Sequence, residues 1–108
     1  MKTNELTGAA LDWAVQIAEG YVQPDPIDFA RNYFKPSTKW IQGGPIIERE
    51  GIATSPHYIF GWAAFQSLIP IESVLYKEYF GPTPLIAAMR CYVASKLGDD
   101  IDVPKELA

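Results

Sequence analysis

Apolar residues recur at helical spacing in two segments of the chain, one near each end. In the segment from Gly8 to Glu19, one side of the predicted helix carries Leu11, Ala14, Val15 and Ala18, which a core would bury. The other side is polar and is expected to face water; it carries Asp12, Gln16 and Glu19. Gly20 follows at the position where a left-handed residue commonly ends a helix.

The second helical segment is the clearest element of the sequence. Thr83 suits an N-cap, Pro84 suits the first helical position, and Gly98 suits the end of the helix. Apolar residues occupy nearly every side of this segment, which is typical of a helix surrounded by other elements. We therefore predict that it is the central and most buried helix, although it carries Arg90 in its middle.

The segment between these helices begins with a second, shorter helix. Asp25 and Pro26 form an N-cap followed by a proline, and the helix is predicted to run to Tyr33. The strongest break in the chain follows, at Gly43, Gly44 and Pro45. The pattern leaves open whether residues 45–50 form a helix or a strand.

Residues 51–65 favour strands, with turn residues at 55–57 between the sequences GIAT and YIFGWAAF. A hairpin alone is marginally stable, so this one is expected to lie on the helices. Residues 71–80 then favour a short helix before Gly81. Together these elements predict an α+β fold: one mostly helical domain over residues 1–108, with a central C-terminal helix and a small β-hairpin.

Composition and charge narrow the class of protein. The 108 residues carry a formal net charge of −4, a field that disfavours general binding to nucleic acid. The N-terminus has no sustained apolar stretch, and no apolar run approaches the roughly 20 residues of a membrane helix. Cys91 is the single cysteine, which suits a reducing compartment. We therefore expect a cytoplasmic protein that does not bind membranes.

Candidate catalytic and metal-binding residues are few. A metal site needs several His, Cys or carboxylate ligands, whereas this chain has one His and one Cys, so no metal or other cofactor is expected. His57 lies in a predicted turn, and Cys91 is interpreted as a core thiol. Glu48 and Glu50 would share a face only in an extended segment, and the preferred interpretation is solvated charge on either side of Arg49. No catalytic constellation is visible.

Arg90 stands alone among apolar neighbours and has three possible roles. It can bury its stem and keep its guanidinium in water. It can form an ion pair with a carboxylate on another element, for which Glu48 is the leading candidate. It can also line a pocket for an anionic ligand. A structural role is favoured over a ligand role, because ion pairs perturb structures more often than they mark sites.

Three stretches resemble one known family: LTGAALDWAV, PSTKWIQGGPIIERE and GPTPLIAAMRCYVASKLGDDIDVP, with WAAF between them. They are similar to the NinX-like family, small proteins of lambdoid phages and bacterial prophages. The resemblance implies a phage accessory protein that acts in the cytoplasm of its host. It brings no established activity and no catalytic residues.

Several residues in these stretches are not easily explained by packing alone. This candidate surface consists of Trp40, Gln42, Gly43, Gly44, Pro45, Glu48 and Arg90. The leading hypothesis is a non-enzymatic module that binds a host or phage protein through Trp40, Gln42 and the turn at 43–45. The alternative is a small-molecule binding protein or enzyme that uses Arg90 and Glu48 on an anionic ligand. The large number of aromatic residues also favours a homodimer slightly over a monomer.

Overall fold

The computed structural model describes the whole chain, residues 1–108. In chain order its elements are η1 (Thr3–Glu5), α1 (Gly8–Glu19), α2 (Pro26–Asn32), α3 (Trp40–Glu50), β1 (Ile52–His57), β2 (Gly61–Gln66), β3 (Tyr79–Gly81), α4 (Pro84–Leu97) and η2 (Lys105–Leu107). The strands form one antiparallel sheet in the order β1-β2-β3. The predicted α+β fold is confirmed.

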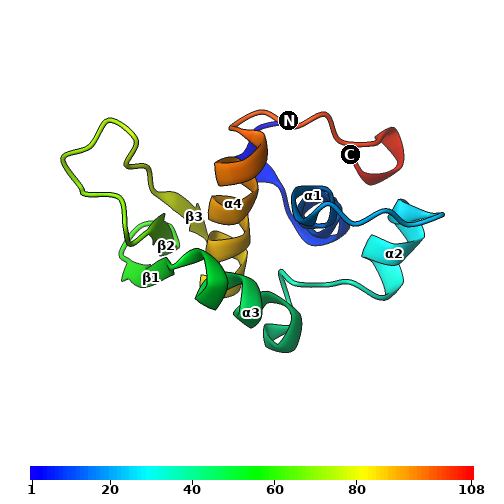
Figure 1. Ribbon diagram of the computed structural model, residues 1–108, viewed down its shortest axis with the longest axis horizontal. Coiled ribbons are helices and arrows are strands. Elements are labelled where there is room, and N and C mark those ends of the chain that lie inside the picture. The colour runs from blue at the N-terminus through cyan, green and yellow to red at the C-terminus, as the bar shows by residue number, and fades with distance from the viewer.

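Helix α4 lies in the middle of the molecule, with the sheet on one side and α1 and α2 on the other (Figure 1). It packs against α1, α3 and all three strands. The Thr83 hydroxyl accepts a hydrogen bond from Ile86 N at 3.1 Å, so the predicted N-cap is present. The predicted central position is also confirmed, because seven residues of α4 are buried: Leu85, Ala87, Ala88, Met89, Cys91, Tyr92 and Val93.

The sequence left open whether residues 45–50 form a helix or a strand, and in the structure they belong to helix α3. This helix also runs through the break predicted at residues 43–45. Pro45 removes only one N–H from the ladder of the helix, so the cost is one missing hydrogen bond and some local distortion. That cost is offset by the packing of Gly43 and Ile46, which are both buried.

The hairpin of β1 and β2 is present, but its turn was predicted too early. The strands pair from Ile52↔Gln66 to His57↔Gly61, so the turn is formed by residues 58–60. His57 Nδ1 accepts hydrogen bonds from Ile59 N and Phe60 N, both at 3.2 Å, and stabilises this turn. Pro56 is tolerated in β1 because this strand is at an edge of the sheet.

The short helix predicted over residues 71–80 is wrong. Residues 67–78 connect β2 to β3 without a helix, and Tyr79 pairs with Ala64 as the start of a third strand. Two features of the segment explain the difference. The free edge of β2 offers backbone partners to residues 79–81, and Ser73 forms turns through Ser73 Oγ to Leu75 N and Ser73 O to Tyr76 N.

The prediction that the polar side of α1 faces water is wrong for Asp12 and Gln16. Asp12 and Gln16 are 3% and 0% exposed. The segment that follows α1 folds back over this side, where Gln16 Nε2 donates to Pro26 O at 3.0 Å and Asp12 accepts from Ser37 N at 2.9 Å. Helix α1 is therefore covered on two sides, by α4 on its apolar side and by residues 26–37 on its polar side.

Candidate functional site

The start of α3 presents two large apolar side chains to solvent. Trp40 is 56% exposed and Ile41 is 85% exposed. The next residue, Gln42, points the other way: its amide accepts a hydrogen bond from Lys35 N and donates to Tyr33 O at 2.9 Å. Gln42 thus ties the first turn of α3 to the segment before it and holds Trp40 and Ile41 on a fixed backbone.

Gly43 has a packing role. A Cβ at this position would lie 2.3 Å from Pro36 O and 2.7 Å from Leu85 Cδ1, so no other residue fits without moving the backbone. Gly44 has open space around it, and Pro45 is exposed. Gln42 and Gly43 are therefore part of the support for this surface, and the exposed members of the predicted set here are Trp40 and Pro45.

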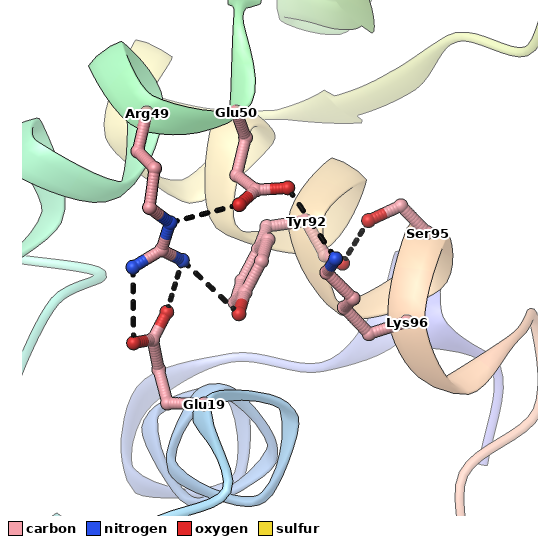
Figure 2. A network of polar contacts seen from close by, with 6 residues as sticks. All are labelled: Glu19, Arg49, Glu50, Tyr92, Ser95 and Lys96. Atoms are coloured by element: carbon pink, nitrogen blue, oxygen red, sulfur yellow. Dashed lines mark hydrogen bonds and ion pairs between the residues drawn. The ribbon is translucent and has the colours of Figure 1, made fainter.

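The structure gathers charged side chains elsewhere, around Arg49, where α1, α3 and α4 meet (Figure 2). The Arg49 guanidinium donates to both carboxylate oxygens of Glu19, and Arg49 Nε donates to Glu50 at 2.8 Å. The ring of Tyr92 lies under the guanidinium, 5.6 Å from Arg49 Cζ. Lys96 Nζ reaches the other oxygen of Glu50 at 3.6 Å.

The electrostatics of this cluster indicate a structural role. Arg49 lowers the pKa of Glu19 through its hydrogen bonds, and burial together with the nearby Glu19 raises the pKa of the Tyr92 hydroxyl. Glu19 and Glu50 each have a cationic partner, and two positive side chains balance two negative ones. The cluster joins α1, α3 and α4 through ion pairs, and each of its charges has a partner of opposite sign, so none is free to bind a substrate.

The predicted ion pair between Arg90 and Glu48 is wrong. Arg90 Nε donates to Leu6 O at 2.8 Å and Arg90 Nη1 donates to Phe80 O at 2.6 Å. Both acceptors are backbone carbonyls, on the segment before α1 and on β3. Glu48 is exposed on α3 and makes no ion pair.

Arg90 instead borders a cavity of about 430 Å³. The other lining residues are Asn4, Phe60, Phe80, Gly81 and Pro82. Burial lowers the pKa of Arg90, and no carboxylate acts in the opposite direction. The residues predicted to act as one site thus divide into a surface at the start of α3 and a cavity near the start of α4.

Two further groups of exposed apolar residues were not predicted from the sequence. One is the β1–β2 turn, where Tyr58 is 93% exposed. The other is the connection between β2 and β3, where four large side chains are 71–94% exposed: Leu68, Ile71, Val74 and Leu75. The second group lies around Pro70, and three of its four residues fall in the segment for which a short helix was predicted.

One more carboxylate is unusual in its surroundings. Asp12 is buried at the junction of α1 and the segment around Ser37, and burial raises its pKa to about 6 in spite of the hydrogen bond that Ser37 N donates to it. It has no cationic partner within ion-pair distance.

No group of three or more His, Cys, Asp or Glu side chains is arranged to hold a metal ion. None of the helices combines the length and the apolar character needed to cross a bilayer.

The sequence of the chain matches the model of one known protein family. The model of the family described as "Bacteriophage P22, NinX" matches residues 2–96. The chain belongs to this family. Among curated proteins, nothing matches the chain. The predicted resemblance to NinX proteins is therefore confirmed, and the family indicates a phage accessory protein.

The NinX match includes every element from η1 to nearly the end of α4. Both the surface around Trp40 and the cavity beside Arg90 therefore lie within the part of the chain that defines the family. The tail with η2, Lys105–Leu107, lies outside the match.

Proposed function

We propose that this NinX protein is a non-enzymatic interaction module that binds a host or phage protein through Trp40 and Ile41. The supporting observation is the exposure of both side chains, 56% and 85%, at the start of a helix that is anchored in the core by the buried residues Gly43 and Ile46. Tryptophan is enriched among the residues that contribute most to binding at protein interfaces.

The backbone below these side chains is fixed, which favours binding. Gln42 is bonded to Tyr33 and Lys35, and Gly43 fits closely against Pro36. A partner would therefore order only the side chains of Trp40 and Ile41, and less conformational entropy would be lost on association. This rigidity distinguishes the surface from the connection between β2 and β3, which has no helix or strand over residues 67–78.

The charge next to the surface indicates what kind of partner fits. Lys39 is exposed and directly precedes Trp40, although the chain as a whole has a net charge of −4. A partner with an apolar pocket and an acidic rim would complement this local charge. Such a pocket on a host or phage protein is the partner that we propose.

The alternative function requires Arg90 and Glu48 to act together on an anionic ligand. The residues that line the cavity beside Arg90 do not include Glu48. An acid–base role of Glu48 at that cavity therefore has no geometric support.

The test is a capture experiment from phage-infected cells, with a photo-crosslinking residue placed at position 41. We expect wild type to crosslink to one partner, and Trp40→Ala to reduce its capture at least tenfold, as expected for a central aromatic anchor. Tyr58→Ala is the matched control, because Tyr58 is also an exposed aromatic residue but lies on the β1–β2 turn.

Two results would contradict the proposal. Equal capture by wild type and Trp40→Ala would remove this surface from the interaction. A crosslink only to a second copy of the chain, together with a dimer in light scattering, would show self-association in place of a host or phage partner. All variants must first give the circular dichroism spectrum and melting temperature of the wild type.

A further inference from the structure

Arg90 is a positive charge with unused hydrogen-bonding capacity. Of the five N–H groups of an arginine, those of Arg90 that bond within the protein are one on Nε and one on Nη1. The remaining groups, including both on Nη2, have no acceptor in the chain. The two bonds to Leu6 O and Phe80 O also fix the plane of the guanidinium, so these free donors point in set directions.

The cavity of about 430 Å³ beside Arg90 provides the space for a ligand. This volume lies within the range of small-molecule sites, roughly 300–1,000 Å³. Asn4 adds a second donor to the cavity wall: its Oδ1 is occupied by Phe80 N at 3.0 Å, so its Nδ2 is left to donate. None of the residues that line the cavity is acidic.

The other part of the wall is aromatic. The rings of Phe60 and Phe80 are 4.8 Å apart between centroids, and His57 packs against both rings at 5.2 and 5.1 Å. Phe60 is 53% exposed, so much of its ring is free to contact a ligand. An apolar or aromatic group placed here would pack on a surface that other rings already hold in position.

We propose that this cavity binds a carboxylate carried on an aromatic or branched apolar group. The carboxylate would accept hydrogen bonds from Arg90 Nη2 and Asn4 Nδ2, and the apolar group would pack on Phe60. A monoanion fits better than a phosphate, because Arg90 is the one cation among the lining residues and the chain is negative overall. Two sources share this chemistry, a small organic acid and the C-terminus of a protein chain that ends in an apolar residue.

The test uses 3-phenylpropionate as the probe and nuclear magnetic resonance of the intact chain as the readout. We expect the signals of Arg90 Nε–H and Gly81 N–H to shift on titration, with a dissociation constant in the millimolar range. The neutral 3-phenylpropanamide, which has the same shape, should shift them at least tenfold less. Inorganic phosphate should also bind more weakly than 3-phenylpropionate.

Two variants that keep the fold locate the binding. Phe60→Ala removes an exposed ring and should weaken binding about threefold to tenfold, the range of one aromatic contact. Tyr58→Ala, on the same turn but not in the wall of the cavity, should leave binding unchanged. A third variant, Arg90→Lys, keeps the charge but loses the guanidinium. Once its spectrum shows that it folds, it should show no shift of the Gly81 N–H signal.

The source of the carboxylate is resolved by comparing one peptide with 3-phenylpropionate. Gly-Gly-Phe with a free C-terminus should bind more tightly than 3-phenylpropionate if the ligand is the end of a protein chain, and no more tightly if it is a small acid. Three results would overturn the proposal: equal shifts with the acid and the amide, tighter binding of phosphate, or equal binding by wild type and Phe60→Ala. The interaction proposed for Trp40 does not depend on any of these outcomes.

Discussion

Arg90, which belongs to α4, and Arg49, which contacts α4 through Tyr92, have opposite surroundings. Arg49 is half exposed, yet it is bonded to two carboxylates and lies over the ring of Tyr92. Arg90 is more buried, yet it has no carboxylate partner and is held by the carbonyls of Leu6 and Phe80. Exposure therefore does not determine which arginine is neutralised.

The difference shows how each side of the molecule is held. On the side of α1 and α3, helices meet through side chains, and an ion-pair network joins them (Figure 2). On the side of the sheet, Arg90 bonds to backbone groups that have no net charge, so its positive charge is not cancelled. The first arrangement is complete in itself, and the second can still accept an anion.

The largest effect is expected from removal of Arg90. Arg90→Met leaves the carbonyls of Leu6 and Phe80 without their charged donor, and each such hydrogen bond typically contributes about 1.5 kcal/mol or more. We expect the free energy of unfolding in urea to fall by about 3 kcal/mol. A loss below about 1 kcal/mol would show that these bonds are replaced by water and that Arg90 does not hold the sheet to α4.

The two carboxylates of α1 extend the comparison, because Glu19 has an arginine partner and Asp12 has none. The folded-state pKa of Asp12 is raised to about 6, so the folded protein binds a proton more tightly than the unfolded chain, and stability falls as pH rises from about 4 to 6. Asp12→Asn keeps an acceptor for Ser37 N and does not titrate. Its stability relative to wild type should therefore improve by about 2 kcal/mol between pH 4 and pH 7, measured by urea unfolding.

Glu19→Gln is the control for this pH dependence. The pKa of Glu19 is lowered in the folded state, so its stabilising effect is present above the pKa of the unfolded chain and is lost as pH falls. Glu19→Gln should thus be most destabilising near pH 7 and least near pH 3. The same direction of pH dependence in both variants would contradict the assignment of Asp12 as the unpaired carboxylate.

A smaller effect is expected from the pair of Arg49 and Glu19. Because Arg49 is half exposed, solvent screens the interaction, and a double-mutant cycle of Arg49→Met and Glu19→Gln should give a coupling energy of about 1 kcal/mol. High salt should reduce this value. A coupling energy near zero would mean that the network of Figure 2 contributes little to holding α1 against α3.

The elements that were predicted correctly depend on local signals. Asp25 caps α2 through Asp28 N, three residues away, and Thr83 caps α4 in the same way. The continuation of α3 through Gly43 could not be predicted, because the carbonyl that approaches this glycine belongs to Pro36 and its other neighbour belongs to Leu85. Patterns of neighbouring residues in the sequence do not indicate such contacts.

The candidate site was predicted only in part, because local signals in the sequence do not show contacts between distant segments. Trp40 was singled out as an aromatic residue beside a backbone break, and its exposure fits that interpretation. The partner of Arg90 was assigned incorrectly because backbone carbonyls carry no residue-type signal, whereas a carboxylate such as Glu48 is visible in the sequence. The burial of Asp12 depends on Ser37, 25 residues further along the chain.

The smallest effect is expected from Glu48, which tests the comparison from the opposite direction. Glu48 is exposed on α3, one residue before Arg49, and makes no ion pair. Glu48→Gln should change the free energy of unfolding by less than about 0.5 kcal/mol, as is usual for surface positions. Combined with Arg90→Met, the two effects should add within about 0.5 kcal/mol, because the residues share no contact. A larger coupling would mean that Glu48 reaches Arg90 in solution, and the free donors of Arg90 would then be neutralised within the chain, which would also remove the basis for an anion at the cavity.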